Sequence, residues 1–212
     1  MKIDTWVDVA CPWCFVGKKR LESAITASGH ADEIELVLHT FELDPGAPRT
    51  PMSNPEYIGR AMGMPAAKAI EFEGQLRALA AAEGLDFTSE RIVARSLDAL
   101  RLVHLAAEHA AAQSFFSAVQ TGLFAGRTDV YSHDFLADAA AAAGVPRALA
   151  LETLRGDKYA DAVAADRAAA AALGARGAPF TVIDERLGIP GVIATETYRE
   201  AIVRAFSERA VS

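Results

Sequence analysis

Cysteine is scarce in this sequence: Cys11 and Cys14 are the only two cysteines among 212 residues. Small secreted scaffolds depend on a dense framework of disulfides, so the shortage excludes that class of protein. In a reducing compartment, a close cysteine pair is seldom a structural crosslink and is more often catalytic, redox-sensing or metal-binding. The chemistry of the chain is therefore expected to centre on this one pair.

Positive charge and long hydrophobic runs are lacking as well. The chain carries 21 Lys and Arg against 28 Asp and Glu, a formal net charge of -7. Nucleic acids are bound by neutralising phosphates with Lys and Arg, so we expect no nucleic-acid partner. No apolar run approaches the roughly 18 residues that a membrane-spanning helix needs, so we expect no membrane partner. The N-terminus starts at once with a strand pattern rather than a secretion signal, which predicts a cytoplasmic protein.

The cysteine pair stands between a predicted strand and a predicted helix. Residues 2–9 alternate in polarity as a strand does, and residues 12–28 carry the apolar stripe of a helix. Pro12 fits the first helical position, which leaves Cys11 near the N-cap. Unpaired N–H groups and the positive end of the helix dipole favour a thiolate there, and the thiolate is the nucleophile of thiol chemistry. The helical period places Cys14 on the apolar face, so we expect Cys11 to be reachable and Cys14 to be sheltered.

An α/β core interrupted by helices is predicted for the rest of the chain. A second strand over residues 34–41 would complete a parallel βαβ unit. Strand pattern returns as a hairpin over residues 180–183 and 187–189, and an amphipathic helix over residues 195–209 follows. Between these parts, predicted helices span residues 54–62, 65–83, 89–112, 114–125, 132–142, 146–155 and 157–173.

This order predicts two domains. Residues 1–45 and 174–212 would form one discontinuous α/β domain with βαβ followed by ββα. Residues 46–173 would form an all-helical domain inserted into it.

Two carboxylates are expected beside the cysteines. Asp8 and Glu42 lie at or near the C-terminal ends of the first and the second predicted strand, at the sheet edge where α/β proteins place their ligands. The simpler interpretation makes both of them solvated residues at strand ends. If either is partly buried, a raised pKa would let it accept the proton of the Cys14 thiol as a general base.

Four further residues are candidate substrate contacts. Pro12 and Trp13 lie between the cysteines, and we expect Trp13 to be a partly exposed lid or substrate contact. Ala178 and Pro179 precede a predicted strand, where a strand-initiating proline is the plainer interpretation. A cis proline there would expose the backbone of Ala178 beside the cysteines, ready to pair with an extended substrate.

A zinc site is not expected. Zinc needs four ligands, usually including a second Cys or His pair at short spacing, and no such pair accompanies the two cysteines. His104 and His109 do not share a helical face, and the other histidines are scattered. We therefore predict no metal and no cofactor beyond the redox pair itself, with glutathione as a candidate co-substrate.

Four stretches carry a resemblance to a known family: Asp8-Val9-Ala10-Cys11-Pro12-Trp13-Cys14-Phe15-Val16-Gly17-Lys18, Phe41-Glu42-Leu43-Asp44-Pro45, Asp98-Ala99-Leu100-Arg101-Leu102-Val103-His104-Leu105-Ala106 and Gly177-Ala178-Pro179-Phe180. In them the chain resembles the DsbA-like branch of the thioredoxin superfamily, and within it the cytoplasmic FrnE-like proteins. The resemblance spans nearly the full length. It implies a thioredoxin-like fold with a helical insertion, Cys11 as nucleophile, Cys14 as resolving thiol and a cis Pro179 facing them.

Three functions follow from these observations. The first is a thiol-disulfide oxidoreductase that exchanges disulfides with a protein or a small thiol. The second is a glutathione-dependent isomerase or transferase, because 2-hydroxychromene-2-carboxylate isomerases and kappa-class transferases look similar in layout. Those relatives typically carry Ser where Cys11 stands, and their chemistry has no evident use for Cys14. The third is a non-catalytic binding module in which the helical block binds a partner. The oligomeric state stays open between monomer and homodimer.

Overall fold

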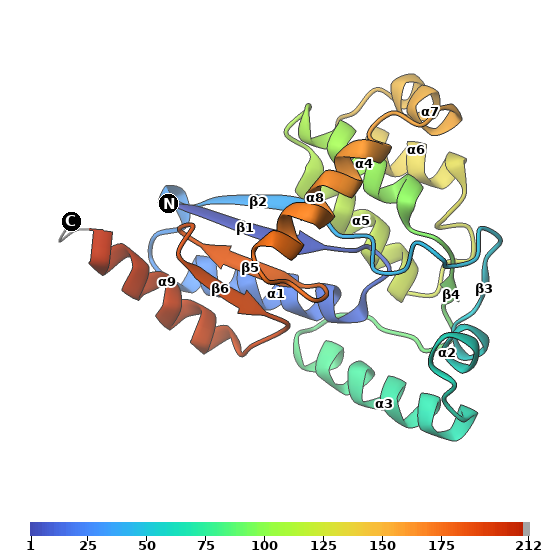
Figure 1. The fold of residues 1–212 in the computed structure, drawn as a ribbon, viewed down its shortest axis with the longest axis horizontal. Helices are drawn as coiled ribbons and strands as arrows, with labels where there is room; N and C mark the ends of the chain where they lie inside the picture. Colours follow the sequence, from blue (N-terminus) through green and yellow to red (C-terminus); the bar gives the residue numbers. More distant parts are fainter. Residues whose placement is uncertain (210–212) are drawn as a thin grey trace.

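The computed structural model is organised around one four-stranded sheet (Figure 1). It describes residues 1–209, except for the side chains of Met62 and Ala66. The sheet contains β1 (Lys2–Val7), β2 (Glu35–Thr40), β5 (Phe180–Ile183) and β6 (Leu187–Pro190), in the order β2-β1-β5-β6. β1 and β2 run parallel, whereas β5 pairs antiparallel with both β1 and β6. The predicted βαβ unit and hairpin are therefore confirmed.

Helices cover both faces of this sheet. α1 (Pro12–Ala27) and α9 (Thr195–Arg209) pack together against one face, and α8 (Ala160–Ala172) crosses the other (Figure 1). The alternation of β1 makes this layering possible, because Ile3 packs with α1 and α9 while Trp6 packs on the side of α8. The end of β1, where the cysteine turn begins, is thus held between two layers.

The section between β2 and β5 is helical, as predicted, apart from one short strand pair. A 3₁₀ turn, Ala31–Glu33, leads into β2. The section itself contains β3 (Met52–Ser53), α2 (Asn54–Met62), α3 (Ala66–Ala82), β4 (Ile92–Val93), α4 (Leu97–Ala107), α5 (Ala112–Phe124), α6 (His133–Ala142) and α7 (Arg147–Arg155) before α8. β3 and β4 pair only with each other. They bracket α2 and α3, which lie below the rest of the helical section in Figure 1.

The predicted division into two domains stays a prediction. Residues 210–212 of the first domain's second segment lie outside the described residues. The largest hydrophobic cluster contains Val7 and Phe15 from the sheet side and Leu100, Phe116 and Leu136 from the helical section. This shared cluster crosses the predicted boundary at residue 46.

The helix predicted over residues 89–112 is wrong at both ends. β4 lies where its first turns were expected, because β4 pairs with the distant β3 and Arg91 is buried against Glu73. α4 then ends at Ala107, and Ala110 has a φ of 55°, which interrupts the helical run before α5. Long-range pairing and burial therefore override the helical propensity of this stretch.

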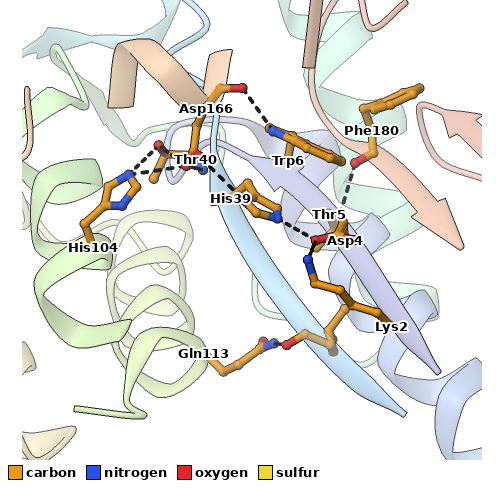
Figure 2. A network of polar contacts seen from close by, with 11 residues as sticks. Lys2, Asp4, Thr5, Trp6, His39, Thr40, His104, Gln113, Asp166 and Phe180 are labelled. Atoms are coloured by element: carbon orange, nitrogen blue, oxygen red, sulfur yellow. Dashed lines mark hydrogen bonds and ion pairs between the residues drawn. The ribbon is translucent and has the colours of Figure 1, made fainter. Parts of the chain in front are cut away.

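Asp166 ties α8 to the sheet (Figure 2). Its Oδ2 accepts hydrogen bonds from the N–H and the hydroxyl of Thr40, at 2.8 and 2.9 Å. The same carboxylate lies 3.4 Å from Nδ1 of His39 and 3.3 Å from Nε2 of His104. Its backbone carbonyl accepts from the indole N–H of Trp6 at 3.1 Å. One residue thus joins α8 to β1, β2 and α4.

No helix within residues 1–209 is long and apolar enough to cross a membrane.

Candidate active site

The turn between β1 and α1 is shaped by Asp8. Its Oδ1 accepts from the N–H of Ala10 at 3.0 Å, and its backbone carbonyl accepts from the N–H of Cys11 at 3.2 Å. Pro12 then opens α1, where its missing N–H interrupts no helical hydrogen bond. Cys11 is left as the N-cap of α1 with an extended backbone, as the sequence predicts.

The Cys11 sulfur has a hydrogen-bond donor and an acceptor in place. It accepts from the N–H of Cys14 at 3.3 Å, and its thiol donates to the carbonyl of Ala178 at 3.4 Å. The Ala178–Pro179 peptide bond is cis, and Pro179 is buried. When Cys11 ionises, the N–H of Cys14 remains as a donor to the negative sulfur. The loop before β5 therefore meets the cysteine turn, and the carbonyl of Ala178 faces the sulfur.

The two cysteines are free thiols, and both are buried. Burial raises the pKa of the Cys14 thiol well above its usual value, and contact with Cys11 and the charge of Asp8 raise it further. Cys14 is thus sheltered, as predicted. The prediction that Cys11 is openly reachable is wrong, because only 2% of it is exposed. Side chains brought by α2 and α3 enclose the start of α1, so its sulfur is approached through a cavity.

This cavity has a volume of about 360 Å³ and lies between the cysteine turn and the segment from β3 to β4. Trp13, Ile58 and Phe72 supply much of its apolar wall. Trp13 is 36% exposed, and its ring lies 6.3 Å from that of Phe72 in an edge-on arrangement. Pro12 and Ala178 line the same space. The candidate substrate contacts around the cysteines are therefore brought together, apart from Pro179, which does not line the cavity.

Asp8 and Glu42 are both buried, so the interpretation of them as solvated strand-end residues is wrong. Asp8 Oδ2 accepts from the N–H of Leu43 at 2.9 Å and from the hydroxyl of Ser96 at 3.0 Å. Burial raises the pKa of Asp8 to about 6 despite these donors. Asp8 also lines the cavity beside Cys11.

Glu42 has a different environment from Asp8. Its two carboxylate oxygens accept from Nε and Nη2 of Arg95 at 2.7 and 3.3 Å, a bidentate ion pair. Glu42 does not line the cavity next to the cysteines. Of the two carboxylates, only Asp8 lines the cavity together with Cys11.

Gln120 and Ser96 support the cysteine turn, and sequence reasoning missed both. Gln120 on α5 donates from Nε2 to the carbonyls of Asp8 and Cys11, at 3.3 and 3.5 Å. The signal for Gln120 was an amide on the same helical face as Phe116, Leu123 and Phe124, where a buried polar group needs a partner. Ser96 had no such signal, because its partner Asp8 is distant in the sequence.

Residues of the segment between β3 and β4 were missed as well. Tyr57, Phe72, Glu73 and Arg91 all line the cavity, yet the sequence shows them only as parts of the helices predicted over residues 54–62, 65–83 and 89–112. No group of three or more His, Cys, Asp or Glu within residues 1–209 is arranged to hold a metal ion.

Comparisons with known proteins identify a family and several solved structures to which this chain is similar. The model of the DSBA-like thioredoxin domain family matches residues 2–203. A crystal structure of a probable DsbA oxidoreductase from Streptomyces coelicolor is 36% identical with a TM-score of 0.92, covering 98% of this chain and 91% of that one. A search of curated protein sequences gave no match.

Two more distant structures share the fold alone. The cytosolic disulfide reductase DsbM from Pseudomonas aeruginosa is 19% identical with a TM-score of 0.62, covering 100% of this chain and 98% of that one, and it was also solved with GSH. A 2-hydroxychromene-2-carboxylate isomerase is 13% identical with a TM-score of 0.68, covering 99% of this chain and 98% of that one. The expected thioredoxin-like α/β fold is confirmed.

Proposed function

Since the chain belongs to the DsbA-like thioredoxin-domain family, we propose that it is a thiol-disulfide oxidoreductase that cycles Cys11 and Cys14 between dithiol and disulfide. One observation carries the proposal. The Cys11 sulfur caps α1, accepts the Cys14 N–H at 3.3 Å, and lies on the wall of a cavity with the Ala178 carbonyl 3.4 Å away. A nucleophilic sulfur, a second thiol one turn along and a space for substrate are thereby assembled.

The reaction proceeds as two thiol-disulfide exchanges. The Cys11 thiolate attacks one sulfur of a substrate disulfide, the substrate S–S bond breaks, and the first substrate thiol leaves. The Cys14 thiolate then attacks the Cys11 sulfur of the mixed disulfide and releases the second thiol. Two electrons pass from the protein dithiol to the substrate, and the two cysteine protons end on the released thiols. The reverse sequence, with the same atoms, oxidises a substrate dithiol.

Asp8 is the proposed proton acceptor for the second exchange. Cys14 must lose its proton before it attacks, and burial makes that loss difficult. Asp8, with a pKa of about 6, carries a charge close enough to Cys14 to affect the pKa of its thiol. Glu42 is assigned no such role, because Arg95 occupies both of its oxygens.

Trapping of the mixed disulfide tests the proposal. In Cys14→Ser the attack by Cys11 survives but resolution does not, so a disulfide-containing peptide accumulates covalently on the protein. In Cys11→Ser nothing should be trapped, because the Cys14 thiol is fully buried. Intact mass under acid quench measures both variants. An adduct on Cys11→Ser but not on Cys14→Ser would reverse the assignment of nucleophile. If the wild-type protein does not accelerate the reduction of insulin by dithiothreitol, the proposed activity itself is contradicted.

The glutathione-dependent isomerase is the second candidate function, favoured by the shared fold of the isomerase neighbour. It requires no thiol at residue 14, so full isomerase turnover by Cys14→Ser would favour it. The binding module is the third, and it predicts that alkylating both cysteines leaves partner binding intact. As part of the first proposal we place the protein in the cytoplasm, with no cofactor beyond the cysteine pair and with a protein or small thiol as partner. A monomer and a homodimer are both compatible with it.

A further inference from the structure

The cavity beside Cys11 controls access to its sulfur. Because Cys11 is only 2% exposed, a disulfide reaches it by placing part of itself inside this space. A volume of about 360 Å³ suits a small organic group or a few side chains. The charges that line the cavity therefore act directly on whatever group is attached to the attacked sulfur.

Carboxylates dominate the charged lining. The charged residues on the cavity wall are Asp8, Asp44, Glu73 and Arg91. Arg91 is not free to receive an anion, because its Nη2 donates to Glu73 Oε1 at 3.1 Å and its Nη1 donates to the other oxygen. Its guanidinium also lies over the rings of Phe87 and Phe124, at 5.0 and 5.2 Å. Glu73 and Arg91 thus neutralise each other.

The charges of Asp8 and Asp44 remain uncompensated on this wall. Asp44 accepts from the hydroxyl of Tyr57 at 2.6 Å and from the N–H of Gly46 at 2.9 Å. The three donors to Asp8 are likewise neutral. Neutral donors stabilise a carboxylate without cancelling its charge at a distance. No Lys, His or second Arg of the described residues lines the cavity.

We propose that this cavity selects disulfides of apolar thiols that are neutral or positively charged, and disfavours anionic ones such as glutathione disulfide. The inference rests on the proposed oxidoreductase function and specifies its substrate class. An anionic group entering the cavity meets like charge in a partly enclosed, low-dielectric space, whereas a cationic group gains attraction. The Cys14 N–H at the N-terminus of α1 is bonded to the Cys11 sulfur, so it is not free to receive an anionic group of the substrate.

Three small disulfides of similar size test the charge preference. Cystamine is cationic, hydroxyethyl disulfide is neutral, and dithiodipropionate is anionic. The rate at which each oxidises the reduced protein is measured by acid quench, alkylation and intact mass. Each rate is divided by the rate at which the same disulfide oxidises free dithiothreitol, which removes differences in intrinsic reactivity. Glutathione disulfide, and peptide disulfides with Lys or Glu beside the cysteine, are measured in the same way. These measurements show whether the preferred substrates are disulfides of small thiols or disulfides of peptides.

The normalised rates should fall in the order cation, neutral, anion, with cystamine ahead of dithiodipropionate by about tenfold or more at low ionic strength. Asp44→Asn should shrink that ratio by about threefold or more, because it removes one charge from the wall and keeps an oxygen for Tyr57. Asp32→Asn, which removes an exposed carboxylate outside the cavity, should leave the ratio unchanged.

Salt provides a second measurement that needs no variant. The ratio for the wild-type protein should fall as sodium chloride is added, because ions screen the wall charges. If the normalised rates for dithiodipropionate and glutathione disulfide equal or exceed the rate for cystamine, the charge preference is overturned. The proposed oxidoreductase function would still stand in that case. If every disulfide oxidises the cysteine pair no faster than it oxidises free dithiothreitol, the proposed function itself fails.

Discussion

At the scale of single residues, Asp8 is buried, and the hydrogen bonds that it accepts lower its pKa by less than its burial raises it. Burial raises its pKa to about 6, above the ordinary value of 3.8, although Leu43, Ala10 and Ser96 donate hydrogen bonds to it. The folded protein therefore holds the Asp8 proton more tightly than the unfolded chain does. The stability that this proton contributes is fully present below the unfolded pKa and is lost as pH rises through about 6.

Asp8→Asn should consequently change stability in a pH-dependent way. The free energy of unfolding of the variant minus that of the wild type should increase by up to about 3 kcal/mol between about pH 4 and about pH 8. Urea unfolding at several pH values measures the difference. Asp32→Asn, at an exposed site, serves as the control and should show no such trend. A pH-independent difference for Asp8→Asn would mean that Asp8 has the same pKa in both states.

The same ionisation should appear in the second exchange reaction. If Asp8 accepts the Cys14 proton, release of the mixed disulfide should show an inflection near pH 6, because only ionised Asp8 can accept a proton. The inflection should be absent in Asp8→Asn, although that variant still forms the mixed disulfide through Cys11. Rapid acid quench at each pH gives the rate. An unchanged profile in the variant would remove Asp8 from the proton path.

The environment of Asp8 shows which part of the site could be predicted from sequence. The pairing of Cys11 and Cys14 at a helix start depends on neighbouring residues, so a local pattern was sufficient. The burial of Asp8 depends on Leu43 and Ser96, which arrive from distant segments. No local pattern reports such contacts, and the solvated interpretation failed for that reason.

At the scale of elements, the N-terminus of α1 and Trp13 set the redox balance of the pair. Trp13 has no imidazole to add positive charge beside the sulfur, so the thiolate depends on the N–H groups of α1. We therefore predict a reduction potential below the value of about -120 mV known for the strong oxidant DsbA. Trp13→His should raise the potential by about 30 mV or more, whereas Trp13→Phe should not. Glutathione redox titration decides between these outcomes, and a wild-type potential near that of DsbA would contradict the argument.

His39 in β2 connects the sheet to α8 through two carboxylates (Figure 2). Its Nε2 lies 2.6 Å from Asp4 and its Nδ1 lies 3.4 Å from Asp166, while its ring stacks on Trp6. Burial alone would lower the pKa of His39, but the hydrogen bonds to Asp166 and Asp4 outweigh it and raise that pKa. The stabilisation is therefore complete below the unfolded pKa of about 6.5 and is lost as pH rises through the folded value.

His39→Gln should reduce stability more at about pH 6 than at about pH 9, by of the order of 1 kcal/mol after solvent screening is allowed for. Asp166 stays ionised across this range, because hydrogen bonds from His104, His39 and Thr40 outweigh its burial and hold its pKa below the usual value. His109→Gln, at an exposed position outside this network, is the matched control. Equal losses at the two pH values would show that His39 is uncharged in the folded protein.

The four strands of the large sheet, and α1 and α9 packed against it, were predicted within one or two residues because their polarity patterns are local. The C-terminal helix, predicted over residues 195–209, has these bounds in the structure. The stretch 89–112 failed because β4 depends on a partner far away in the sequence. Alanine-rich sequence also favours a helix wherever no stronger contact intervenes, so it gave no warning of that pairing.

At the scale of the whole molecule, the shared hydrophobic cluster predicts a single cooperative unfolding transition. Phe15 of α1 stacks on Phe124 of α5 with ring centroids 4.7 Å apart, so the sheet side and the helical section share buried surface. Far-ultraviolet circular dichroism reports mainly the helices, while tryptophan fluorescence reports Trp6 and Trp13 on the sheet side. The two urea curves should coincide. Separate midpoints would instead support the predicted division into a discontinuous α/β domain and a helical domain over residues 46–173.

The clasp formed by β3 and β4 has an evolutionary consequence. The chain leaves the body of the protein at Ser53 and returns at Ile92, and these two residues are paired. Residues 54–91 are therefore a cassette whose two ends meet, and it carries Tyr57, Phe72 and Glu73 of the cavity wall. A change of sequence within this cassette alters the cavity wall without replacing Cys11, Cys14 or Pro179, which all lie outside it. The apolar part of substrate choice can therefore vary with residues 54–91, whereas the charge preference stays with Asp8 and Asp44 outside them.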